Sequence, residues 1–168
     1  PCGGGRSSST RGVLMGMGDS GNTIQFITIA SQGVNSQDFG DLNTSSYGVG
    51  AGEISDGLRG VAMGGSGAPA DQTNVIDFIT IATTGNATDF GDDTIDGRGE
   101  GNASFASATR GVFAGGYSTV DGAVSNISYM IISSNGGVND FGDLLFPRYS
   151  NAGASNQIRG LSFAGKPS

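Results

Sequence analysis

Four aspartates lie close together in one short segment, a grouping that could bind a metal ion. Calcium in proteins is held by several carboxylate and carbonyl oxygens from one loop. The spacing differs from that of an EF-hand, so the segment is a candidate for a weak Ca²⁺ site, with a solvated acidic turn as the structural alternative. No other cofactor is expected. The candidate metal ligands are Asp89, Asp92, Asp93 and Asp96.

Paired carboxylates could also catalyse hydrolysis of a glycosidic bond. The acidic pair recurs, however, in an Asp-Phe-Gly-Asp sequence that starts at Asp38, Asp89 and Asp140, which fits a structural turn better than one active site. The chain has no histidine, so Ser/His and Cys/His catalysis within it are excluded, and its single cysteine, Cys2, has no partner. We therefore predict that the protein is not an enzyme, and a glycan-cleaving enzyme is the alternative.

Arginine and tyrosine side chains could bind a ligand. Arginines begin the recurring Arg-Gly sequences, and their structural interpretation is an ion pair with the recurring aspartates. Their functional interpretation is binding of a ligand carboxylate or acidic sugar by Arg59 and Arg110. Tyr47, Tyr117 and Tyr149 fall in predicted loops or at the edges of units, where an aromatic ring packs its own loop or stacks on a sugar or a partner protein. These five residues are the candidate binding residues.

Three landmarks recur in the same order along the chain and predict an internal repeat. The Asp-Phe-Gly-Asp sequence returns every 51 residues. Before it in each unit come an Arg-Gly sequence and then a run rich in β-branched and aromatic residues, such as residues 76–82. Arg-Gly sequences followed by an apolar residue, the recurring landmark, start at Arg11, Arg59, Arg110 and Arg159. We predict one repeat domain, 1–168, with units at about 11–46, 47–97 and 98–148 and a partial unit at 149–168.

Each unit is predicted to contain four short strands. A small-residue strand is followed by the Arg-Gly strand, a longer strand apolar on both faces, and the Asp-Phe-Gly-Asp strand. The phenylalanines of the last strand, Phe39, Phe90 and Phe141, are expected to fill the core of each unit. Glycine interrupts every candidate helix. The expected fold is therefore all-β, and four strands per unit of about 50 residues are typical of a β-propeller blade.

Composition excludes several classes of partner. The chain of 168 residues has 15 acidic and 8 basic residues, a net charge of −7 that would repel a nucleic-acid backbone. No apolar run reaches the roughly 18 residues of a membrane span, and no basic amphipathic segment suits a membrane surface. We expect neither nucleic acid nor membrane as a partner.

The order of the landmarks resembles the kelch motif. In the third unit, residues 113–117, Tyr129, Phe141 and the Pro147-Arg148 pair occupy the positions of the kelch glycine pair, aromatic strand, turn and Pro-Arg. Phenylalanine stands where kelch repeats have tryptophan, and tryptophan is absent from the chain. The resemblance implies a kelch-like propeller or propeller segment.

A second resemblance covers nearly the whole chain. The sequence of residues 79–92, together with an Arg-Gly-Val-Phe-Ala-Gly-Gly strand, is similar to repeats in structural proteins of tailed phages that infect marine cyanobacteria. It implies a virion component, such as a tail fibre, tailspike or decoration protein, with an extracellular or virion location.

The sequence thus predicts a virion or surface structural module that displays loops for attachment, with a host glycan as the ligand class. Loops 67–73 and 118–125 differ most between units and are the best candidates for specificity. Because three and a half blades cannot close a ring, we expect association with other copies or other virion proteins, or a longer parent chain. A self-assembling fibre or capsid subunit without a receptor is the main alternative.

Overall fold

The computed structural model describes residues 5–17, 21–44, 54–65, 74–95 and 98–167. Within these ranges the chain forms strands and turns and no helix, which confirms the predicted all-β fold. The strands make several small antiparallel sheets. Among the same residues no helix could cross a membrane.

The first sheet has four strands in chain order, β1-β2-β3-β4. It begins upstream of the predicted unit boundary at residue 11, because β1 pairs with β2. The strands are β1 (Gly5–Ser7), β2 (Arg11–Met17), β3 (Thr23–Thr28) and β4 (Gln37–Asp41).

The second and third sheets follow the same antiparallel order. The second contains β5 (Arg59–Met63), β6 (Val75–Thr80) and β7 (Thr88–Asp92). An isolated bridge between Ser55 and Gly60 lies where β1 lies in the first sheet. The third contains β9 (Ala103–Ala106), β10 (Arg110–Ala114), β13 (Asn126–Ile131) and β14 (Asn139–Asp143).

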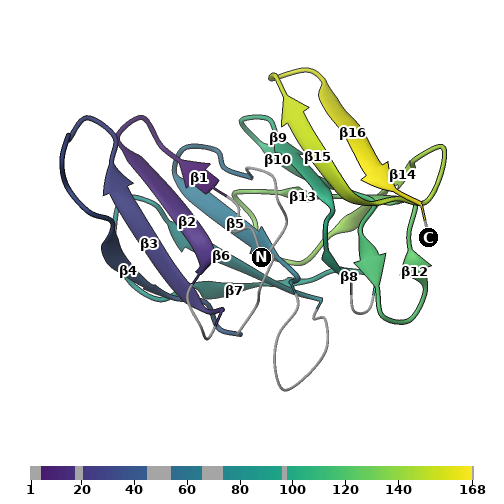
Figure 1. The fold of residues 1–168 in the computed structure, drawn as a ribbon, viewed down its shortest axis with the longest axis horizontal. Coiled ribbons are helices and arrows are strands. Elements are labelled where there is room, and N and C mark those ends of the chain that lie inside the picture. The colour runs from purple at the N-terminus through teal and green to yellow at the C-terminus, as the bar shows by residue number, and fades with distance from the viewer. Residues whose placement is uncertain (1–4, 18–20, 45–53, 66–73, 96–97, 168) are drawn as a thin grey trace.

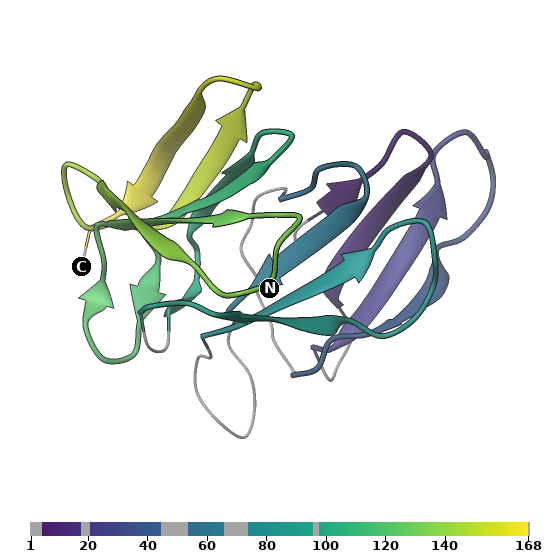
Figure 2. The ribbon, with the colours of Figure 1, turned by 180° about the vertical axis from the view of Figure 1, so that it is seen from behind.

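Two smaller sheets complete the described chain. The hairpin of β15 and β16 packs on β9, and a three-stranded sheet has the order β12-β11-β8. Figures 1 and 2 show the first sheet and the β15–β16 hairpin at opposite ends of the molecule. Their strands are β8 (Arg98–Glu100), β11 (Tyr117–Ser118), β12 (Gly122–Ala123), β15 (Tyr149–Ser155) and β16 (Gly160–Lys166).

The first three sheets share one register. Each Arg-Gly strand pairs with the next strand from its arginine onward, through the pairs Arg11↔Thr28, Arg59↔Thr80 and Arg110↔Ile131. The register then shifts where the Asp-Phe-Gly sequence of the last strand begins, as expected of a β-bulge. The bulge accommodates one extra residue in the last strand, and in each sheet this residue is the phenylalanine of the Asp-Phe-Gly sequence.

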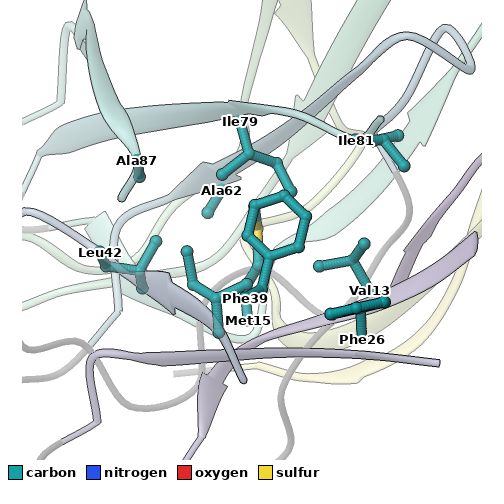
Figure 3. Packing of buried hydrophobic residues seen from close by; sticks show 10 residues of the cluster. Val13, Met15, Phe26, Phe39, Leu42, Ala62, Ile79, Ile81 and Ala87 are labelled. Atoms are coloured by element: carbon teal, nitrogen blue, oxygen red, sulfur yellow. The ribbon is translucent and has the colours of Figure 1, made fainter. Parts of the chain in front are cut away.

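Buried side chains fill the spaces between successive sheets. Phe39 of β4 is 3% exposed and lies among residues of the first sheet and Ala62, Ile79 and Ile81 of the second (Figure 3). Phe90 of β7, 2% exposed, lies in the corresponding cluster with Phe113, Met130 and Ile132 of the third sheet. Strand β6 is therefore apolar on both faces, because one face packs on the first sheet and the other on the third.

A side-chain cap precedes each of the four Arg-Gly sequences that an apolar residue follows. Its oxygen accepts hydrogen bonds from the backbone N–H groups of the arginine and of the residue before it, at 2.7–3.4 Å. Serine, aspartate and asparagine favour such turns because their short side chains reach the backbone two or three residues on. The capping residues are Ser8, Asp56, Ser107 and Asn156.

Backbone contacts also join one sheet to the next. Gly85 N donates to Phe39 O at 2.7 Å, and Gly136 N donates to Phe90 O at 2.9 Å. The approach is so close that a Cβ on Gly91 would lie 2.3 Å from the backbone nitrogen of Gly137. Glycine after the phenylalanine is therefore needed for the contact as well as for its φ of 134°.

Candidate functional site

The structure brings two of the predicted binding tyrosines together. The ring centroids of Tyr117 on β11 and Tyr149 on β15 are 5.3 Å apart, in an edge-to-face arrangement. Tyr117 is 37% exposed and Tyr149 is half-buried. We call these two residues the tyrosine pair. Tyr47, the third predicted tyrosine, lies outside the described residues.

Backbone geometry fixes the tyrosine pair. Gly116 N donates to Arg148 O at 2.8 Å, so the residues just before the two tyrosines are hydrogen-bonded to each other. Ser150, the residue after Tyr149, has a φ of 55°, a left-handed conformation that few residues with a side chain adopt. Strained backbone of this kind persists where surrounding contacts hold it, and it is common at binding sites.

The predicted specificity loop 118–125 begins beside the tyrosine pair. It forms a hairpin of β11 and β12, and Ser118 Oγ accepts hydrogen bonds from Val120 N and Asp121 N at its turn. Val120 is largely exposed at this turn. The loop is thus held at its base and presents its tip to solvent. The other predicted loop, 67–73, lies outside the described residues.

The arginines of the Arg-Gly sequences have other contacts than the ion pairs expected from the sequence. Arg59 lies over the ring of Phe78 at 4.5 Å and donates to Ile132 O of the next sheet at 3.2 Å and to Asn135 Oδ1 at 3.0 Å. A planar guanidinium suits this position, because it stacks on an aromatic ring and still donates at its edge. The aspartates are not needed as partners, because a backbone carbonyl accepts the hydrogen bond. Arg59 is therefore engaged within the protein.

Arg110, the other predicted binding arginine, is more accessible. Its guanidinium lies over Tyr129 at 4.8 Å, and the residue is exposed. Within the described residues, its guanidinium makes no hydrogen bond to a backbone carbonyl of the kind that Arg11 and Arg59 make.

The four predicted metal ligands have different surroundings. Asp89 Oδ1 accepts a hydrogen bond from Gly91 N, Asp92 is exposed, and Asp93 is buried. Asp96 lies outside the described residues. In the described part of the chain, no three acidic or cysteine side chains gather in a group that could hold a metal ion. A weak Ca²⁺ site at these residues stays a prediction.

A buried ion pair that sequence reasoning missed holds Asp93. Arg98 Nε lies 2.7 Å from Asp93 Oδ2, both side chains are fully buried, and Arg98 Nη2 donates to Ser128 Oγ at 3.0 Å. Burial raises the pKa of Asp93 and lowers the pKa of Arg98, while their mutual attraction opposes both shifts. The corresponding residue of the first sheet, after its Asp-Phe-Gly-Asp, is the buried Leu42. The sequence signal for this buried pair was an aspartate at a position where the first unit has leucine.

A second buried carboxylate joins the first two sheets. Asp77 Oδ1 and Oδ2 accept hydrogen bonds from the side chain and backbone of Asn43 at 2.7 and 3.0 Å. Burial raises the pKa of Asp77, and these hydrogen bonds partly oppose the shift. Both buried carboxylates are thus occupied by contacts between or within sheets.

No protein-family model matches the chain, and no curated protein matches it either.

Proposed function

We propose that the chain is a non-catalytic structural module of a virion or a cell surface that displays an aromatic site and its adjoining loop for attachment, with a glycan as the ligand class. The observation that carries the proposal is the tyrosine pair. Its members come from strands far apart in sequence, are fixed by backbone hydrogen bonds, and present a partly exposed aromatic surface. Aromatic rings bind sugars by stacking on their apolar faces, which needs such a fixed, accessible edge.

The stacked sheets support a display role. Repeated caps, bulges and inter-sheet hydrogen bonds give a frame in which loops can vary without changing the core. We propose further that these sheets are blades of a kelch-like β-propeller or propeller segment, since the first and third keep the four-strand order of such a blade and the second keeps three of its strands. The likeness to structural proteins of marine cyanophages supports a virion location, and many copies on one particle would raise the avidity of a weak site.

A glycan-binding measurement tests the proposal. The chain, immobilised at high density, should retain bacterial surface polysaccharides, and Tyr117→Ala should weaken retention about tenfold, which corresponds to about 1.4 kcal/mol for the loss of one stacked ring. Phe146→Ala is the matched control, because Phe146 is an exposed aromatic residue outside the tyrosine pair. Equal retention by the two variants, or none by the wild type on host polysaccharide, would contradict the proposal.

One observation favours the architectural alternative. The face of the first sheet that has no preceding sheet in the described chain exposes Leu14, Ile27 and Ile29. Exposed apolar surface of this kind is common at protein interfaces. If copies assemble spontaneously into polymers and Leu14→Lys/Ile27→Lys disperses them, self-assembly is the main function.

A further inference from the structure

A groove of about 430 Å³ separates the outer face of the third sheet from the β15–β16 hairpin. Its walls are mainly apolar and include Phe105, Val112, Phe141 and Ile158. The tyrosine pair does not line it. The groove is therefore a separate candidate for binding, independent of the glycan proposal.

The β15–β16 hairpin contacts the third sheet in the same way as the segment that begins the second sheet, at Ser55, contacts the first sheet. Ser55 Oγ donates to Ser7 O at 2.9 Å, and Ser155 Oγ donates to Ala106 O at 2.8 Å. Both serines stand four residues before an Arg-Gly sequence. The hairpin thus occupies the position of the first two strands of a fourth sheet.

The third and fourth strands of that sheet are missing from the described chain. In the first three sheets, the Arg-Gly strand pairs with a following strand, as β10 pairs with β13. In the described part of the chain, β16 pairs only with β15, so its other edge is open. An open strand edge offers unpaired backbone groups to an added strand.

The outer face of the third sheet is exposed at positions that the next sheet covers in the first two sheets. Phe141 is 54% exposed, although Phe39 and Phe90 at the same position are buried by the next sheet. Nothing lies within 4 Å of a Cβ built on Gly142, whereas the corresponding Gly91 is closely approached by backbone. On the third sheet, the surface that receives a glycine-containing loop in the two internal contacts is thus exposed among the described residues.

Arg110 lines the same groove. Arg11 and Arg59 each donate to a carbonyl in the residues just after the third strand of the next sheet, Ile81 O and Ile132 O. A strand added beside β16 would bring the corresponding carbonyl to Arg110. The Arg110 guanidinium already lies over the Tyr129 ring, as that of Arg59 lies over Phe78.

We propose that this groove binds a β-hairpin segment of another polypeptide, whose first strand adds to the open edge of β16. Its apolar residues at alternate positions would fill the groove as Ile79 and Ile81 fill the contact between the first two sheets. Its glycine-containing turn would donate a backbone N–H to Phe141 O, as Gly85 and Gly136 do in the internal contacts. The partner is recognised mainly through backbone pairing and two or three apolar side chains.

A second copy of the chain fits this groove less well than a free hairpin. The face of the first sheet that is complementary to the third sheet carries its own β1 and β2. These two strands correspond to β15 and β16 and would need the same space. A segment that supplies only the third and fourth strands has no such conflict.

The test uses a synthetic peptide with the sequence of residues 126–143, which forms the third and fourth strands of the third sheet. Fluorescence anisotropy of the labelled peptide should rise saturably with full-length chain. A peptide of the same composition in shuffled order should not bind. Amide hydrogen exchange should slow along β16 and at Gly142 when the true peptide is present.

Variants locate the binding surface. Phe141→Asp should weaken binding at least about tenfold, because a charge would be buried against the peptide. Ile158→Asp should act in the same way, and Ile158 is 90% exposed, so folding should be unaffected. Leu58→Asp is the matched control, since Leu58 is equally a turn residue before an Arg-Gly sequence but lies outside the groove.

Three results would overturn the proposal. They are absence of saturable binding, equal loss of binding in the Leu58 control, and self-association of the chain that Ile158→Asp abolishes, which would assign the groove to a second copy. None of these results bears on the polysaccharide measurement with Tyr117→Ala, so failure here and failure of the proposed function are distinguishable.

Discussion

The interface between the second and third sheets and the outer face of the third sheet present the same residue types in the same register. At the interface, Phe90 is buried, Gly91 receives a backbone loop, and Arg59 reaches a carbonyl of the next sheet. On the outer face, Phe141 is exposed and nothing approaches Gly142. The third sheet thus keeps its strand pairing, its bulge and the contact of Phe141 with Tyr129 although no described sheet covers its outer face, so only the burial of that face depends on a neighbour.

The largest expected difference concerns the two phenylalanines. Phe90→Ala should lower the free energy of unfolding by about 3–5 kcal/mol, because it leaves a cavity in a packed core. Phe141→Ala should cost about 1 kcal/mol, the order of its edge-to-face contact with Tyr129. Urea denaturation of the two variants measures both values. Similar losses would show that Phe141 is buried in solution by another molecule.

The next largest difference concerns the glycines that follow these phenylalanines. Gly142→Ala should cost about 1–3 kcal/mol for placing a side chain at a φ of 132°. Gly91→Ala has a similar φ and should cost about 1–3 kcal/mol more, because its Cβ would meet the backbone of Gly137. Thermal unfolding of the two variants compares them directly. If the two transitions shift equally, close approach of the loop makes no contribution to the interface.

The smallest expected difference concerns the arginines. Arg59→Ala should cost about 1–2 kcal/mol, since it removes a stacked cation and a charged donor to Ile132 O. Arg110→Ala should cost about 0.5 kcal/mol, because only its stacking on Tyr129 is lost. Chemical denaturation in low salt resolves the pair of values. A larger loss for Arg110 would mean that its guanidinium has a further partner.

Local features of the fold could be predicted from the sequence, whereas contacts between sheets could not. Alternation of apolar residues and the recurring Arg-Gly and Asp-Phe-Gly sequences predicted the strands, because strand formation depends on neighbouring residues. The exposure of Phe141 could not be predicted, because the same Asp-Phe-Gly-Asp sequence surrounds Phe39 and Phe90. Only the presence of a neighbouring sheet differs. The propeller and the repeat boundaries stay predictions.

The candidate site was predictable in composition and not in geometry. The sequence indicates that Tyr117 and Tyr149 are aromatic residues in loops or at unit edges, but their contact depends on the hydrogen bond between Gly116 and Arg148. Asp93 stands among acidic neighbours in the sequence, but its burial beside Arg98 separates it from the exposed Asp92. Charge clusters in a sequence do not reveal which members point into the protein.

Proteins made of similar neighbouring units are prone to pair the wrong units during folding. The Asp93–Arg98 pair distinguishes one boundary from the other, because the first sheet has Leu42 at the corresponding position. Arg98 also donates to Asn126 O and Ser128 Oγ of the third sheet, so docking of the second sheet elsewhere would leave a buried guanidinium without these acceptors, at a cost of about 1–3 kcal/mol. The second sheet thus has buried polar contacts that match the third sheet through Ser128 and the first sheet through Asn43, and these contacts favour one order of stacking.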